Sequence, residues 1–232
     1  SMNDECMSIV TCINEKRYCF ENEKVLGVVS PTYFWRLPRI VAAFLENIQM
    51  INCAYTFFVL SYGTTTGSAV HFTEKLMQEN NQKFDAYYSV IMPDTWTPMF
   101  DLTDQKKVDA KLNEGEQQLQ NIITKIQVNT NGDFVKGKLP VLITALPSLY
   151  MYHTERKTKL LSVNKDICIG CGLCAKRCPV QAIAMKDGYP VWKDKECEMC
   201  LGCLHRCPKF AIQYGNGKTN KHGQYRNPNT AI

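Results

Sequence analysis

The chain has 232 residues, of which 45% are hydrophobic and 21% charged, and its formal net charge is +5. This composition is typical of a folded globular protein and excludes an intrinsically disordered chain. No stretch approaches the roughly 20 consecutive apolar residues that a membrane-spanning helix needs, and the first residues lack a signal-peptide pattern. We therefore expect a cytoplasmic protein with one medium and one small domain.

Short apolar runs alternate with helical patterns over the first 130 residues, which indicates an α/β domain with a parallel sheet. The predicted strands are residues 8–13, 25–30, 54–61 and 86–92. The predicted helices are residues 39–48, 68–79 and 104–127, each with apolar side chains at helical spacing.

The domain boundaries follow from changes in composition. Residues 129–138 are polar and contain glycine, so we predict a first domain over residues 1–138. Residues 139–160 are apolar but interrupted by Pro140 and Pro147, and we assign them as a linker packed between domains. A second, cysteine-rich domain follows over residues 161–214, and residues 215–232 form a polar tail that we expect to be mobile.

Eight of the twelve cysteines form two copies of C-x2-C-x2-C-x3-C-P, placed 29 residues apart. Two-residue spacers let three thiolates surround one iron-sulfur cubane, whereas the fourth cysteine follows on a helical turn and points toward the neighbouring cubane. The spacing therefore predicts two [4Fe-4S] clusters, each held by three cysteines of one motif and the fourth cysteine of the other. One cluster is assigned Cys168, Cys171, Cys174 and Cys207, and the other Cys197, Cys200, Cys203 and Cys178.

Two other uses of these cysteines are disfavoured. A zinc ion takes four tetrahedral ligands, normally from two C-x2-C pairs, and would leave four of the eight cysteines without a role. Disulfide frameworks belong to small secreted chains, and these cysteines are spaced too tightly for one. Cys6, Cys12, Cys19 and Cys53 are predicted to be reduced thiols in a reducing compartment. His205, inside the second motif, is predicted to be a solvated helix residue rather than a ligand.

Positive charge is concentrated at the C-terminal end. Residues 160–232 hold eleven Lys or Arg and five Asp or Glu, so they carry +6 and the remainder carries −1. An oxidised cluster held by four thiolates carries about −2, so two clusters offset about four of these charges. We therefore expect no nucleic-acid partner and no membrane partner. Lys176, Arg177 and Arg206 form a basic rim, which either meets an acidic redox partner or balances the clusters.

Both parts of the chain resemble known families. On its two cysteine motifs, the segment 164–214 resembles the two-cluster bacterial ferredoxins, a small α+β fold, which implies one-electron transfer with redox partner proteins. Residues 5–128 resemble a flavodoxin, a doubly wound parallel sheet that binds FMN beyond its strand ends. The whole chain resembles fused flavodoxin–ferredoxin proteins of anaerobes.

Two loops carry the flavodoxin resemblance and the FMN site that it implies. They hold Pro31, Thr32, Tyr33, Phe34 and Trp35 after the second predicted strand, and Ser61, Tyr62, Gly63 and Thr64 after the third. In that family an aromatic face stacks on the flavin ring while a Gly-bearing loop reaches its pyrimidine edge. Packing within the core or between domains is the alternative for the three aromatic residues. Trp96 either closes over the flavin or fills a domain interface.

The N-terminal end departs from the family. A flavodoxin opens with a strand, a Ser/Thr/Gly-rich phosphate loop and a helix, and nothing before Ser8 matches these elements. The missing strand would be central in the order 2-1-3-4-5 and would separate strand 8–13 from strand 25–30. We expect a truncated flavodoxin part rather than a rearranged strand or a second chain.

Three functions follow from these patterns. An electron-transfer protein is the leading hypothesis, since clusters carry single electrons and a flavin converts between one-electron and two-electron chemistry. The alternatives are a flavin-dependent reductase fed by the clusters and a ferredoxin on a cofactor-free flavodoxin scaffold. His71 and His153 lie in no recognisable catalytic setting, so no catalytic residue is assigned.

Overall fold

The computed structural model describes residues 5–215, 217 and 219–228. The chain divides into two compact units, Ser1–Ile91 with Glu114–Tyr152 and Met92–Asn113 with His153–Ile232. The chain thus passes from one unit to the other three times. No single boundary, such as the one expected at residue 138, separates these units, because the second unit is built from two segments that are distant in sequence.

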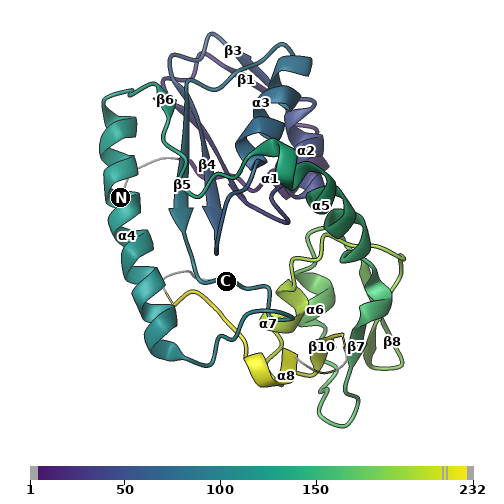
Figure 1. Ribbon diagram of the computed structural model, residues 1–232. Helices are drawn as coiled ribbons and strands as arrows, with labels where there is room; N and C mark the ends of the chain where they lie inside the picture. The colour runs from purple at the N-terminus through teal and green to yellow at the C-terminus, as the bar shows by residue number, and fades with distance from the viewer. Residues whose placement is uncertain (1–4, 216, 218, 229–232) are drawn as a thin grey trace. The chain divides into compact units, whose positions relative to one another are not determined.

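The first unit contains a four-stranded parallel sheet (Figure 1). Its strands are β2 (Leu26–Pro31), β4 (Thr56–Tyr62), β5 (Ala86–Ile91) and β6 (Gly132–Asp133), in the order β2-β4-β5-β6. The strands predicted at residues 25–30, 54–61 and 86–92 are confirmed. β4 and β5 are buried almost throughout, as expected for apolar runs covered on both faces.

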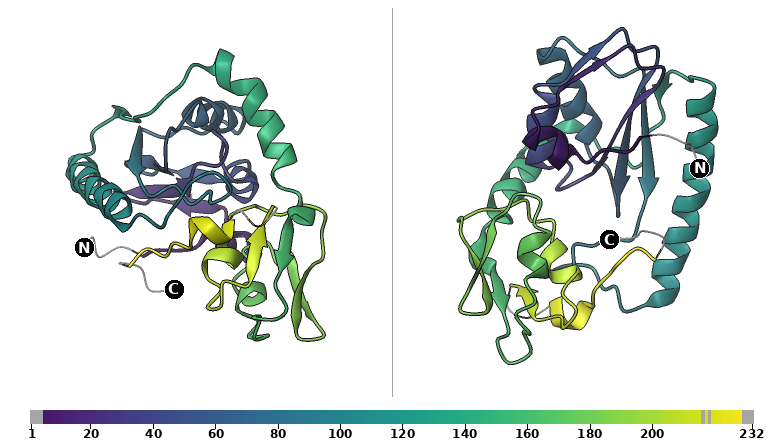
Figure 2. Two further views of the ribbon diagram at one scale, coloured as in Figure 1. Left: turned by 60° about the horizontal axis from the view of Figure 1, so that its bottom comes forward. Right: turned by 180° about the vertical axis from the view of Figure 1, so that it is seen from behind.

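Helices cover both faces of this sheet. α2 (Arg39–Leu45) and α3 (Ala69–Glu79) lie on one face, where Phe58 and Leu60 join the core. The second half of α4 (Gln105–Gln127) lies on the other face, and Figures 1 and 2 show it opposite α2 and α3. All three helices match the predicted ranges 39–48, 68–79 and 104–127.

The strand predicted at residues 8–13 is wrong, because this segment forms the helix α1 (Ile9–Asn14). Ser8 caps the helix by accepting a hydrogen bond from the backbone N–H of Val10 at 3.2 Å. Ile9, Cys12 and Ile13 have helical spacing and join the first core. Three short strands of this unit were not predicted: β6, and the pair β1 (Cys19–Glu21) and β3 (Gln49–Ile51), which run parallel to each other and are largely exposed.

Most of the predicted linker forms the helix α5 (Val141–Thr154). Pro140 immediately precedes the helix and Pro147 lies inside it, which is why the sequence pattern indicated an irregular segment. Two buried hydroxyl groups attach the helix to the first unit. The Ser68 and Thr144 hydroxyl oxygens lie 2.6 Å apart, and Arg36 Nε donates to Ser148 Oγ at 3.0 Å.

The second unit repeats one short pattern twice. Each cysteine motif leads into a four-residue helix, α6 (Leu173–Lys176) or α7 (Gly202–His205), and then into a strand, β8 (Ile183–Lys186) or β10 (Ile212–Tyr214). β8 forms a hairpin with β9 (Tyr189–Trp192), visible in Figure 2. β10 pairs antiparallel with β7 (Leu161–Val163), which follows a 3-10 turn at Thr158–Leu160. The core of this unit centres on Leu204, Ile212 and Tyr214.

The described part of the polar tail differs from the mobile end that we expected. It contains α8 (Thr219–His222) and then a segment, residues 222–226, that is hydrogen bonded to α7. Residues 216, 218 and 229–232 of the predicted tail, and residues 1–4 of the predicted first domain, lie outside the described residues. None of the helices in the described ranges is long and apolar enough to cross a membrane.

Candidate functional site

Two cavities in the second unit each gather four cysteines. One is lined by Cys168, Cys171, Cys174 and Cys207, and the other by Cys178, Cys197, Cys200 and Cys203. We call them the first-motif and second-motif cavities, after the motif that supplies three of the four sulfurs. The last cysteine of each motif lies beyond its short helix, in the cavity of the other motif. The fold thus brings together the two sets that the spacing predicts.

Left-handed backbone turns shape the loops around the sulfurs. Gly170 and Gly172 have φ values of 64° and 71° in the first motif, and Met199 and Leu201 take the matching conformations, 51° and 50°, in the second. A side chain in this region costs about 1 kcal/mol or more. Both second-motif side chains are buried in the core, which offsets that cost. A Cβ on Gly170 would come within 2.8 Å of the Gly188 carbonyl oxygen, so this loop needs glycine.

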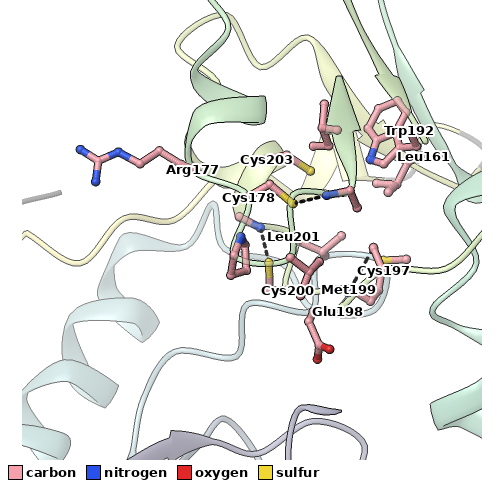
Figure 3. Close-up of a pocket in the computed structure, with 15 residues that line it drawn as sticks. Leu161, Arg177, Cys178, Trp192, Cys197, Glu198, Met199, Cys200, Leu201 and Cys203 are labelled. Atoms are coloured by element: carbon pink, nitrogen blue, oxygen red, sulfur yellow. Dashed lines mark hydrogen bonds between the residues drawn. The ribbon is translucent and has the colours of Figure 1, made fainter. Parts of the chain in front are cut away.

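Backbone N–H groups donate hydrogen bonds to four of the sulfurs. The bond from Ala182 to Cys178 Sγ, at 3.2 Å, has its counterpart in the second motif from Ala211 to Cys207 Sγ at 3.3 Å. Cys197 and Cys200 accept from the N–H groups two residues further on, at 3.3 and 3.5 Å. Dashed lines in Figure 3 mark the bonds at Cys178, Cys197 and Cys200. Such donors stabilise negative charge on sulfur and tune a bound metal centre.

Burial makes the thiols poor acids unless a cation replaces the proton. It raises the pKa of Cys197 to about 11, and it also raises the pKa values of Cys174, Cys200 and Cys203. A bound metal stabilises the thiolate directly and releases these protons. Among the described residues, no group of three or more His, Cys, Asp or Glu side chains is close enough to hold a single metal ion. The sulfurs surround cavities lined mainly by apolar side chains, and four thiols around each cavity suit an iron-sulfur group.

Charged residues are distributed unevenly around the cavities. Arg156 is only 4% exposed, and its guanidinium lies 3.9 Å from a carboxylate oxygen of Glu198, a residue that lines the second-motif cavity. Its carbonyl oxygen accepts from the N–H of Cys197 at 3.1 Å. Of the expected basic rim, Lys176 and Arg177 are exposed, and Figure 3 shows the Arg177 side chain pointing away from the sulfurs. The sequence did not single out Arg156, because only the fold brings it to the second motif.

His205 is buried, so its predicted solvation is wrong. It is 6% exposed, and its Nε2–H donates to the Thr95 carbonyl at 2.9 Å. Its Nδ1 accepts from the backbone N–H of Tyr225 at 3.2 Å. Burial lowers its pKa, which favours this neutral form. Both ring nitrogens are therefore engaged in hydrogen bonds within the protein.

The residues predicted to bind flavin lie in the first unit. The two loops leave neighbouring strands at the same edge of the sheet, because Pro31 is in register with Ser61. Trp35 connects the loops: its Nε1–H donates to Thr65 Oγ1 at 2.7 Å, and its ring lies against Gly67. Tyr62 is 7% exposed and points into the interior. Thr65 was not selected from the sequence, although it belongs to the same Thr-rich and Gly-rich loop.

Apart from Tyr62, the predicted flavin residues are at least partly accessible to solvent. Partly buried positions are Pro31, Thr32, Tyr33, Phe34, Trp35, Ser61 and Gly63, whereas Thr64 is exposed. Phe34 and Trp35 have left-handed φ values of 51° and 62°, which turn the first loop back on itself. The two aromatic side chains are thus presented by a tight turn rather than by a strand.

Comparison with known proteins places residues 160–208 in a family described as a 4Fe-4S dicluster domain. An uncharacterised ferredoxin of Methanocaldococcus jannaschii is 40% identical over 63 residues, which cover 25% of this chain and 35% of that protein. A polyferredoxin of Methanothermus fervidus is 34% identical over 58 residues, or 24% of this chain and 13% of that protein. A ferredoxin of Pyrobaculum islandicum is 31% identical over 77 residues, or 30% of this chain and 70% of that protein.

The family match falls on the part of the chain that forms the two cysteine-lined cavities. The chain belongs to the ferredoxin family. It spans about a third of the Methanocaldococcus relative and a smaller part of the polyferredoxin. No solved structure matches the chain.

Proposed function

We propose that this chain is an electron carrier with two [4Fe-4S] clusters, one in each cavity. The grouping of four sulfurs in each cavity, with one sulfur exchanged between the motifs, supports this proposal most strongly. Bound clusters would supply one-electron chemistry, while the eight cysteines would hold them and backbone N–H groups would donate to the sulfurs. Since each motif contributes to both cavities, α6 and α7 connect the two sites covalently.

We propose further that the first unit is flavodoxin-like and that its two loops bind the ring of FMN. The loops lie at the carboxyl ends of adjacent parallel strands, the usual ligand site of doubly wound sheets. Trp35 and Phe34 offer aromatic surface there, and the Thr-rich loop offers polar groups. Bound FMN would exchange electrons singly or in pairs. The described residues before β2 form α1 and β1 and include no Ser/Thr/Gly-rich loop after a strand, so no phosphate ligand is assigned.

The proposed partners are redox proteins, and the proposed setting is a reducing compartment such as the cytoplasm. Eight cluster thiolates require reduced cysteines, and such thiols persist where disulfides do not form. The excess of basic residues after residue 160 is compensated largely by the clusters' own charge, so it calls for neither nucleic acid nor a membrane.

Anaerobic reductive titration tests the electron-carrier function. Protein purified without oxygen should take up about two electrons per chain, one for each cluster, with bleaching of the cluster absorbance. Electron uptake that is negligible, or that involves no change in cluster absorbance, would refute an electron-carrying role.

Flavin binding is tested on the same protein after removal of any bound flavin. Added FMN should lose fluorescence on binding, and replacing Trp35 with Ala should weaken its binding about tenfold, because both the aromatic surface and the connection between the two loops are lost. Val29→Ala, at an exposed position of β2 outside both loops, is the control. Unchanged FMN fluorescence with the wild-type chain would contradict FMN binding and support the alternative function, a ferredoxin on a cofactor-free scaffold.

A further inference from the structure

We propose that residues 222–226, here called the tail strap, hold Cys207 in position as a ligand of the cluster in the first-motif cavity. This inference rests on the proposed two-cluster function. It concerns a segment whose composition resembles that of a free polar end, yet whose side chains contact the cysteine motif directly. All the residues involved belong to the second unit.

The tail strap donates hydrogen bonds to carbonyl groups at the end of α7 and in the turn that follows it. A helix leaves its last four carbonyl groups without intrahelical partners, and α7 is only four residues long. Gln224 Nε2 donates to the Leu204 carbonyl at 2.6 Å and to the Cys207 carbonyl at 2.9 Å. A single amide group therefore fixes the start and the end of the turn that carries Cys207.

Arg226 engages the two carbonyls between them. Its Nε donates to the His205 carbonyl at 3.1 Å, and its Nη2 donates to the Arg206 carbonyl at 2.6 Å. Together, two tail side chains bind four consecutive carbonyl groups, from Leu204 to Cys207. A cationic side chain is also favoured at the negative end of a helix.

The other end of the strap is anchored to the segment Met92–Asn113 of the same unit. His222 Nδ1–H donates to the Thr97 carbonyl at 2.6 Å, and the His222 carbonyl accepts from the Leu102 N–H at 2.8 Å. Gly223 follows with a φ of 77°, and a Cβ there would lie 3.2 Å from Thr103 Cγ2. The strap is thus held at both ends, and at its centre the Tyr225 N–H bonds to His205.

The internal repeat shows what the strap adds. At the end of α6, Cys178 N–H bonds to the Ala175 carbonyl at 3.3 Å, and Gln181 N–H bonds to the Cys178 carbonyl at 3.1 Å. Cys207 and Phe210 make the same two bonds after α7, at 3.3 and 3.1 Å. Among the described residues, Gln224 and Arg226 donate these hydrogen bonds to carbonyl groups of the second motif and not to the matching carbonyl groups of the first.

Cys207 should depend on the strap more than Cys203 does. Cys203 lies on α7 beside Leu204, which is completely buried, so the hydrophobic core fixes its position. Cys207 lies in the turn after the helix and contributes to the first-motif cavity. Loss of the strap should therefore loosen the cluster built mainly on Cys168, Cys171 and Cys174, which lie far from the tail in sequence.

The test uses the full chain with Gln224→Glu and Arg226→Ala combined. Glutamate has the shape of glutamine but presents oxygen instead of the donor Nε2 to the two carbonyls. Iron release to a chelator should become biphasic, with half of the iron leaving roughly tenfold faster or more because several hydrogen bonds are lost. Electron paramagnetic resonance should identify the fast half as the cluster that Cys207→Ser damages. Asn220→Ala with Lys221→Ala, at exposed tail positions, should behave as wild type.

Two results would overturn the strap proposal: an unchanged release rate, or equal acceleration of both halves, which indicates general loosening. If the double variant does not fold, Arg226→Lys provides the same test, because it keeps the charge but loses the two-pronged contact. A smaller acceleration, again confined to one half, is then expected, and uniform or absent acceleration again rejects the strap. Wild-type protein without iron and sulfide would instead refute the proposed function.

Discussion

Cys207 belongs to the second motif by sequence but lies in the cavity of the first. Its sulfur accepts the N–H of Ala211, and Cys178 accepts the matching N–H of Ala182. The exchange arises because the three-residue spacer carries the fourth cysteine past a short helix and away from its own triplet. Each fourth cysteine therefore lies in the cavity of the motif that is more distant in sequence.

Replacing Cys207 with Ser should damage the cluster of Cys168, Cys171 and Cys174 and spare the one next to it in sequence. About half of the iron should be lost or converted to a three-iron form, because one of four thiolates is missing. Cys178→Ser is the matched variant and should damage the other cluster. Resonance spectra in which Cys207→Ser perturbs the Cys197 triplet instead would contradict the exchanged pairing.

At the scale of the elements, α4 is held by hydrophobic packing on the sheet. α4 covers one face through Ile122 and Ile126, which contact Tyr88 and the other side chains of the second core cluster. Tyr88 itself stacks on Phe134, with ring centroids 5.4 Å apart and an interplanar angle of 9°. The second half of α4 is therefore part of the core of the first unit.

Replacing Ile126 with Ala should lower the free energy of unfolding of the first unit by about 2–4 kcal/mol, through lost burial and the cavity left behind. Ile126 is 4% exposed, whereas Val128, beyond the end of the same helix, is 70% exposed. Val128→Ala should therefore change stability by less than about 0.5 kcal/mol. Urea unfolding followed by circular dichroism measures both; equal effects would show that α4 does not pack on the sheet as described.

Elements with a strong periodic pattern could be predicted from the sequence, and short ones could not. Residues 54–61 form a short apolar run rich in aromatic side chains, which favours a buried strand, and most of it forms β4. Residues 8–13 form a run so short that its pattern fits either a strand or a helix, and the hydrogen bond at Ser8 stabilises the helix that is observed. The two cysteine sets were predicted because ligand spacing is a local property of the chain. Arg156 and the tail strap were missed because their contacts are distant in sequence.

On the scale of the whole molecule, two units carry separate chemistry. The second unit holds all eight motif cysteines and the excess of basic charge, which matches the negative charge of iron-sulfur clusters. The first unit offers a sheet edge with two connected loops, the proposed FMN site. The family comparison covers residues 160–208, which lie in the second unit, so it supports the proposed iron-sulfur clusters there and does not bear on the proposed FMN site.

Iron, zinc and acid-labile sulfide counted per chain, in protein prepared without oxygen, test the central claim most directly. Two cubanes require about eight iron and eight sulfide per chain and no stoichiometric zinc. Zinc at one or two atoms per chain without sulfide would show that the cysteines hold single ions, and four iron with four sulfide would show that only one cavity carries a cluster.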